Sequence, residues 1–180
     1  MRLLFLIFFF ISTNSYAECN FRTAEYIKEL VNPASIKSID IEIPKSSKYA
    51  RNLFKIFSSK SESISNKLKK KFDANLSIYY NFGICHFNAK VRQSGDWKDH
   101  IKLENGMPIR SLDVKLNNGN IIGVTRFKLL IPETRNGKNE ILATLILREL
   151  DFIAPETFEV NVIVNGTKSI MLFQEKAAKE

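Results

Sequence analysis

Residues 139–175, NEILATLILRELDFIAPETFEVNVIVNGTKSIMLFQE, carry the strongest structural signal in this sequence. The apolar segment 139–150 has the length of a helix, and Pro155 lies in the link that follows it. Two strand-like segments then flank Asn165-Gly166, a dipeptide that favours the tight turn of a β-hairpin. The sequence therefore predicts a helix, a short link and a terminal hairpin.

The segments 76–82 and 84–91, which lie earlier in the chain, also have the pattern of strands. In the second of them Cys85, Phe87, Ala89 and Val91 share one face, and the residues between them are mostly polar. A further hairpin is expected from residues 111–116 and 121–130, joined by a turn that contains Asn118-Gly119. A series of antiparallel strands is therefore expected after residue 75.

The N-terminal half has shorter signals. A short helix over residues 23–31 ends before Pro33, and the alternation of Ile39, Ile41 and Ile43 predicts a strand. Apolar residues at helical spacing predict two helices, over residues 48–59 and 61–72. We therefore expect an α+β fold, in which a mainly antiparallel sheet packs against one helix and an N-terminal helical and strand segment (18–74) precedes it.

Residues 1–17 have the features of a secretory signal peptide. Arg2 precedes an apolar run over residues 3–11, and the small residues Ser15 and Ala17 precede a cleavage point before Glu18. The run is too short to cross a bilayer core of about 30 Å as a helix. Export to a periplasm, a cell surface or the medium is expected, with no membrane span after cleavage; an uncleaved anchor or an acylated Cys19 are the alternatives.

Two cysteines, Cys19 and Cys85, remain after residue 17. An even number in a chain sent to an oxidising compartment is compatible with one disulfide that ties the N-terminus to a strand. Two unpaired thiols are the alternative.

The chain has a formal charge of +8, which would draw it to phosphate, acidic polymers or an anionic surface. The lysines at 67 and 69–71 lack the interleaved aromatic residues of a nucleic-acid patch, and export leads away from chromosomal DNA, so no nucleic-acid partner is expected. His86 and His100 have no partner at zinc-like spacing, so no metal site is expected.

Several motifs between residues 87 and 176 resemble the CotH kinase-like family of secreted or spore-coat proteins. They are RQSG at 92–95, RSLDVKL at 110–116, FKLL at 127–130, LRELDFIAP at 147–155, and the terminal hairpin with Glu175. Two features depart from the family pattern, Asp151 in place of a common glycine and TKSI at 167–170. The resemblance implies that residues 75–180 form a kinase-like N-terminal lobe that is truncated at its C-terminus.

A kinase-like lobe grips nucleotide phosphates with a strand cation that a helix carboxylate holds in place. The resemblance implies that Lys115 is this cation and that Glu140 or Glu149 is its partner. The alternative is that Lys115 shares a solvent-facing side of its strand with Asp113.

The resemblance also implies that Arg92 and Gly95 form a phosphate-facing turn, and that Glu175 lies at the lobe junction beside the adenine. An ordinary turn at Gly95 is the alternative. The carboxylates for magnesium come from the second lobe in kinase-like folds, so ATP and Mg²⁺ are expected to bind only if such a lobe is present.

Together these features predict an exported CotH-like protein, a fragment or degenerate member of a secreted ATP-dependent protein kinase family that is not catalytic alone. A protein substrate or an envelope partner is expected. The alternative is a noncatalytic, envelope-associated binding or structural protein. A polymer-binding module is a third interpretation, which the single tryptophan, Trp97, supports little.

Overall fold

The computed structural model describes residues 18–104 and 106–176. Its three α-helices are α1 (Ile27–Leu30), α2 (Ser46–Phe57) and α3 (Lys138–Glu149), and its short 3₁₀ turns are η1 (Pro33–Ser35), η2 (Asn66–Leu68), η3 (Lys98–His100) and η4 (Pro132–Arg135). The strands are β1 (Glu18–Cys19), β2 (Ile36–Glu42), β3 (Phe72–Tyr80), β4 (Gly83–Gln93), β5 (Ile101–Glu104), β6 (Met107–Arg110), β7 (Leu112–Leu116), β8 (Arg126–Leu130), β9 (Thr157–Val164) and β10 (Thr167–Glu175). The predicted signal peptide lies outside the described residues.

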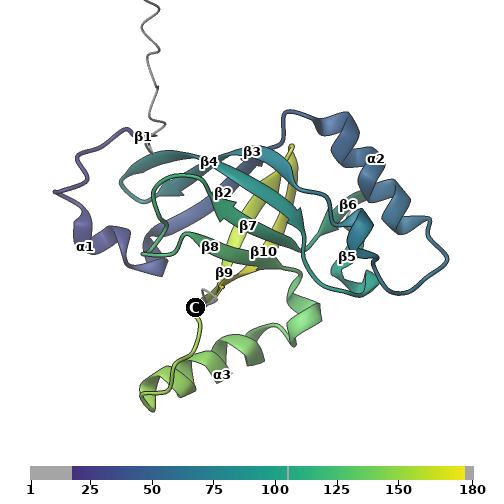
Figure 1. The fold of residues 1–180 in the computed structure, drawn as a ribbon. Helices are drawn as coiled ribbons and strands as arrows, with labels where there is room; N and C mark the ends of the chain where they lie inside the picture. Colours follow the sequence, from purple (N-terminus) through teal and green to yellow (C-terminus); the bar gives the residue numbers. More distant parts are fainter. Residues whose placement is uncertain (1–17, 105, 177–180) are drawn as a thin grey trace, which may run out of the picture.

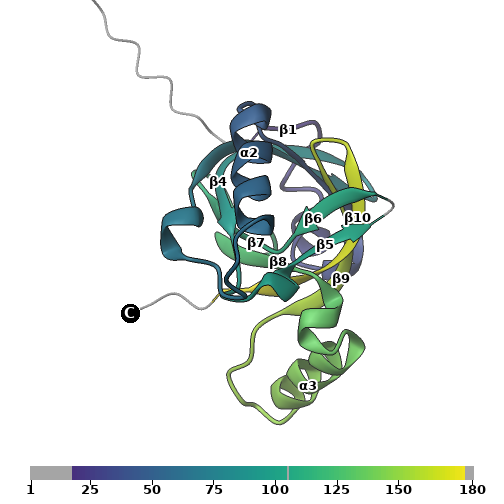
Figure 2. The ribbon, with the colours of Figure 1, turned by 90° about the vertical axis from the view of Figure 1, so that its right-hand side faces the viewer.

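The main sheet closes on itself. Its strand order is β4-β3-β2-β9-β10-β8-β7, and β7 pairs back with β4, so the described residues form a closed barrel of seven strands. The β2–β9 pair is parallel, whereas the other pairs of the ring are antiparallel. Figure 2 looks toward one end of this barrel, where α2 and the separate β5–β6 hairpin lie across the opening.

The strands form because their side chains alternate between the barrel interior and its outside. In β3 the buried residues are Phe72, Ala74, Leu76, Ile78 and Tyr80. The alternation predicted for β4 is confirmed, since Cys85, Phe87, Ala89 and Val91 are buried and the residues between them are not. The apolar faces of all the strands therefore meet inside the ring, and one cluster fills it.

The terminal hairpin forms as expected. Asn165 and Gly166 have φ of 45° and 84°, which matches the positive φ that a two-residue turn requires at both positions. The Asn165 side-chain oxygen also accepts a hydrogen bond from the Ile43 backbone N–H at 2.7 Å. The turn is thereby tied to the end of β2, beside the parallel β2–β9 pair.

The expected α+β fold with a helix packed on an open sheet is wrong. Strand accounts for 43% and helix for 26% of the structure, and the sheet is a closed barrel, not a kinase-like small lobe. The physical reason is that the sheet buries its apolar face against itself and needs no helix to cover it. The helix α3 lies outside the barrel, below it in Figure 1, where its main contacts are with β9 and η4.

Three local elements differ from those that the sequence predicts. The expected helix over residues 61–72 is wrong, because only η2 is helical there and Phe72 begins β3. The helix expected over residues 23–31 is reduced to α1, and the strand expected from residue 121 begins at Arg126. In the first case the spacing of Ile64, Leu68 and Phe72 suits a helix, but Phe72 belongs to the period-two pattern of β3 and packs in the barrel core.

The helix α2 confirms the prediction for residues 48–59. Tyr49 faces the barrel core, while Leu53 and Ile56 form a smaller cluster with Ile64 and Ile101. Phe54 and Phe57, on the same helix, are exposed. This helix therefore seals one end of the barrel and leaves part of its apolar surface open.

Candidate functional site

The residues that the sequence predicts for nucleotide binding lie on separate elements: Arg92 on β4, Gly95 in the loop after it, Lys115 on β7, Glu149 on α3 and Glu175 on β10. Arg92 on β4 lies opposite Asp113 on β7, and its Nε and Nη2 both donate to Asp113 Oδ2, at 3.1 and 2.8 Å. Lys176, just after β10, donates to the same oxygen at 2.6 Å. The guanidinium edge of Arg92 is therefore occupied by a carboxylate of this chain.

Asp113 is the centre of this cluster and is not the solvent-facing residue of the alternative interpretation. Its side chain is buried, and burial pushes its pKa upward, but the hydrogen bonds from Lys176 and Arg92 outweigh burial and hold the pKa below its usual value. Lys128, opposite Asp113 on β8, has a pKa lowered mainly by burial. The arrangement is a structural ion-pair network that links β4, β7 and the end of β10.

Lys115 and the predicted helix carboxylates are not brought together. Lys115 is exposed on β7, and within the described part of the chain no ion pair joins it to Glu140 or Glu149. Glu149 is exposed on α3, and Glu140 instead accepts a hydrogen bond from Gln174 Nε2 at 2.6 Å. The resemblance implies that Lys115 and a helix glutamate together hold a phosphate group, but the structure does not bring these residues together.

Gly95 and Glu175 have local structural contacts. Gly95 has φ of +83°, and a Cβ at this position would lie 1.9 Å from Cδ2 of the His100 ring. The pKa of His100 is lowered mainly by burial, and its Nδ1 lies 2.9 Å from Ser111 Oγ. Glu175 accepts a hydrogen bond from the Glu156 backbone N–H at 3.3 Å. Gly95 thus permits the close approach of His100, and Glu175 ties β10 to the start of β9.

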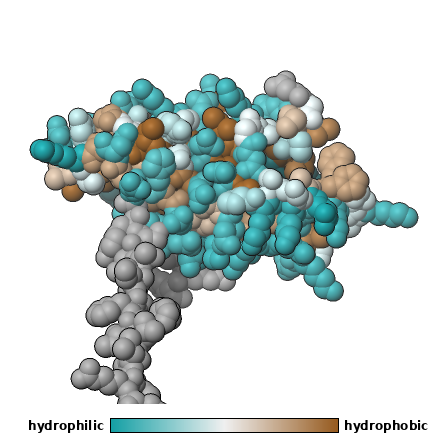
Figure 3. Space-filling view, turned by 90° about the horizontal axis from the view of Figure 1, so that it is seen from above, coloured by the Kyte–Doolittle hydropathy of each residue, from teal (hydrophilic) through white to brown (hydrophobic). Residues whose placement is uncertain are grey.

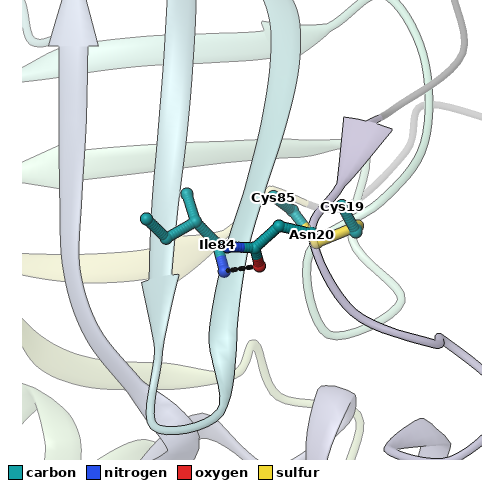
Figure 4. Close-up of a disulfide and its surroundings, with 4 residues drawn as sticks. All are labelled: Cys19, Asn20, Ile84 and Cys85. Atoms are coloured by element: carbon teal, nitrogen blue, oxygen red, sulfur yellow. Dashed lines mark hydrogen bonds between the residues drawn. A yellow bond between two sulfur atoms is a disulfide. The ribbon is translucent and has the colours of Figure 1, made fainter.

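Cys19 and Cys85 are joined by a disulfide (Figure 4). It connects the two-residue strand β1 to β4, and the Asn20 side-chain oxygen next to it accepts a hydrogen bond from the Ile84 N–H at 2.7 Å. The N-terminal segment is held further by aromatic contacts of Phe21 with Tyr26 and Phe82. The bond fastens the start of the described chain to the barrel wall.

The helix α3 carries several exposed apolar side chains outside the barrel. Thr144 is its one fully buried residue, whereas the residues at helical spacing on another face are exposed by about half: Leu142 (55%), Leu145 (50%), Ile146 (48%) and Leu150 (61%). Phe152 and Ile153, which follow the helix, are also exposed. We call these six residues the α3 apolar face. The sequence predicted a helix packed on the sheet but did not indicate which of its residues would face the sheet.

A second feature is an apolar cavity of about 380 Å³ at the end of the barrel. Its walls come from α2, from the β5–β6 hairpin and from the turn between β9 and β10. Seen from above, hydrophobic side chains emerge from a largely hydrophilic surface, some of them at the right-hand end, where α2 and β5–β6 lie (Figure 3). The sequence offered no local signal for this cavity, because its walls are far apart along the chain.

Within residues 18–104 and 106–176, no three His, Cys, Asp or Glu side chains are placed to hold a metal ion. In the same part of the chain, every helix is too short or too polar to traverse a membrane.

No known protein-family model matches the sequence, and no curated protein matches it significantly. The resemblance to the CotH kinase-like family therefore stays a prediction.

Proposed function

We propose that this protein is an exported, noncatalytic binding protein of the cell envelope that docks onto a partner protein through the α3 apolar face. This corresponds to the alternative function that the sequence suggested. The observation that carries the proposal is the row Leu142, Leu145, Ile146 and Leu150, which leaves a helical apolar stripe uncovered by the rest of the described chain.

Exposure of this apolar stripe to water carries a cost in free energy. Burying one Leu, Ile or Phe side chain is worth about 1.5–3 kcal/mol, and soluble proteins rarely leave several such side chains contiguous on one surface unless a partner covers them. An amphipathic helix that lays such a stripe into a groove is a common mode of protein recognition. The α3 apolar face has the side-chain spacing that this mode requires.

The helix is also held in a fixed position, which reduces the entropy lost on binding. Gln174 on β10 donates to Glu140 in the first turn of α3, and Arg148 in its last turn pairs with Glu156, the residue before β9. Both ends of α3 are therefore attached to the barrel by side-chain contacts, while the α3 apolar face is exposed to solvent. A rigid barrel with one outlying helix suits a docking module.

Export is the second part of the proposal. It is supported by the signal peptide predicted at residues 1–17 and by the Cys19–Cys85 disulfide, since disulfides persist mainly in oxidising compartments. The kinase-related activity is not carried forward, because the small-lobe fold on which it depended is wrong and the Lys115–glutamate pair is not formed.

The docking proposal is tested by photo-crosslinking in living cells. A photoreactive amino acid replaces Ile146 on the α3 apolar face, and in a matched control it replaces Lys115, which is exposed on the barrel wall. We expect a discrete crosslinked product at position 146 that is absent at position 115 and is lost when Leu142→Lys is added.

Sedimentation of the purified protein tests whether a second copy of the chain, and not a different protein, covers the α3 apolar face. We expect a monomer whose mass is unchanged by Leu142→Lys. A dimer that Leu142→Lys dissociates would assign the α3 apolar face to a second copy of the chain and overturn the proposal of a different partner. The absence of a crosslink at position 146 would overturn docking through this helix.

A further inference from the structure

The cavity at the barrel end contains a buried cation. Arg110, the last residue of β6, lines the cavity and is only 3% exposed. The other lining residues that the structure describes are apolar or uncharged, so no carboxylate among them neutralises this guanidinium. A single positive charge in an apolar cavity is costly unless something pairs with it.

The position of the Arg110 guanidinium is fixed by α2. Its Nη1 donates to Asn52 Oδ1 at 3.2 Å, and its Cζ lies 3.8 Å from the centre of the Tyr49 ring. Asn52 is itself held, because its Nδ2 donates to the Leu68 carbonyl at 2.9 Å. The cation is therefore oriented by a ring face and an amide that are one helical turn apart.

The opposite edge of the same guanidinium has no partner. Both Nε and Nη2 of Arg110 are buried and make no hydrogen bond within the described residues. These two nitrogens form the fork that receives a carboxylate with two parallel bonds. Arg92 shows the same edge in use in this protein, where Nε and Nη2 both contact Asp113.

We propose that this cavity binds an apolar molecule that ends in a carboxylate, with the carboxylate on the Nε/Nη2 edge of Arg110 and the apolar chain along α2 and the β5–β6 hairpin. The cavity volume of about 380 Å³ lies in the range of small-molecule sites, which extends from about 300 to 1,000 Å³. A carboxylate satisfies both donors at once, and the apolar walls accept a hydrocarbon chain but not a compact polar anion.

The rim of the cavity explains how such a ligand enters. Phe54 and Phe57 on α2 and Leu103 and Met107 on the β5–β6 hairpin line the cavity and are more than half exposed. Nε and Nη2 of Arg110 are shielded from solvent, so the side chains packed against this edge have to shift before a carboxylate contacts it. Exposed side chains such as those of the rim rotate on the picosecond to nanosecond timescale.

The test is calorimetric titration of the purified protein with dodecanoate and, in parallel, with dodecanol, both below their aggregation limits. The two probes share the hydrocarbon chain and differ in the charged head. We expect dodecanoate to bind about tenfold or more tightly than dodecanol, since a charge-assisted pair of hydrogen bonds contributes at least that factor. In Arg110→Met the two probes should bind equally.

A second variant keeps the test decisive if Arg110→Met fails to fold. Ala50 is exposed at the wall of the cavity, so Ala50→Trp fills the mouth without disturbing the core. Ser47→Trp, at an exposed position on the same helix that does not line the cavity, is the matched control. Ala50→Trp should weaken dodecanoate binding at least tenfold, and Ser47→Trp should leave it unchanged.

Three results would overturn the inference: no binding of dodecanoate, equal binding of dodecanoate and dodecanol to the unmodified protein, or binding that Ala50→Trp does not weaken. The site is formed by α2, β5, β6 and the β9–β10 turn, whereas the proposed docking surface is on α3. Failure of either proposal therefore leaves the other standing.

Discussion

Reduction of the Cys19–Cys85 disulfide should lower the stability of the protein by about 4 kcal/mol. The bond closes a loop with a sequence separation of 66 residues. In the chain-entropy treatment, a cross-link over about 66 residues removes roughly 4 kcal/mol of conformational freedom from the unfolded chain at 25 °C. The native barrel itself needs no change on reduction, because its seven-strand ring closes through pairs that do not involve β1.

The measurement is urea unfolding, followed by far-UV circular dichroism, with and without dithiothreitol. With a slope of about 2 kcal/mol per molar urea, a loss of about 4 kcal/mol shifts the midpoint down by about 2 M. Cys19→Ser should unfold near the reduced midpoint and should not respond to dithiothreitol. A midpoint shift below about 0.5 M on reduction would refute the argument, because it would mean that the bond constrains the unfolded chain very little.

Two further predictions concern the barrel wall. Asp113→Asn should lower the stability at pH 7 by about 1–2 kcal/mol, since its basic partners are partly exposed and screened. Because the folded-state pKa of Asp113 is lowered, its contribution is present above about pH 4 and is lost as the pH falls through that lowered pKa. The stability difference between the two proteins should therefore shrink in acid, and a difference that stays constant as the pH falls below about 4 would contradict this. Gly95→Ala should destabilise by about 2 kcal/mol or more, because it adds a Cβ at positive φ against the His100 ring. Gly123→Ala, also at positive φ but in open space, should cost only about 1 kcal/mol, and equal losses in thermal unfolding would exclude the contact with His100 as the cause.

Local patterns in the sequence predicted most of the individual elements. The alternation at Phe87, Ala89 and Val91 located β4, and Asn165-Gly166 located the terminal hairpin, because strand period and turn chemistry act between near neighbours in the chain. The helical spacing over residues 48–59 and the helix-length apolar segment 139–150 likewise located α2 and α3. These signals depend only on side chains a few positions apart.

Closure of the barrel was not predictable in the same way. It depends on the pairing of β4 with β7 and on the parallel pairing of β2 with β9, whose partners Ile39 and Val162 are far apart in the sequence. The residue pattern of a single strand does not indicate whether its sheet is open or closed. For the same reason the sequence predicted that the helix packs on the sheet, since a stripe that covers a sheet and a stripe that binds a partner have the same composition.

The cavity cation shows why a binding site of this kind escapes sequence reasoning. Arg110 stands between Ile109 and Ser111, and its ring and amide contacts come from a helix about 60 residues earlier in the chain. The geometry nevertheless distinguishes it from Arg92, which has its carboxylate partner within the chain. The Nε/Nη2 edge of Arg92 is thus occupied by Asp113, whereas the same edge of Arg110 is buried without a hydrogen-bond partner among the described residues. Since an unpaired buried guanidinium destabilises the fold, the missing carboxylate on Arg110 is best supplied from outside the described chain.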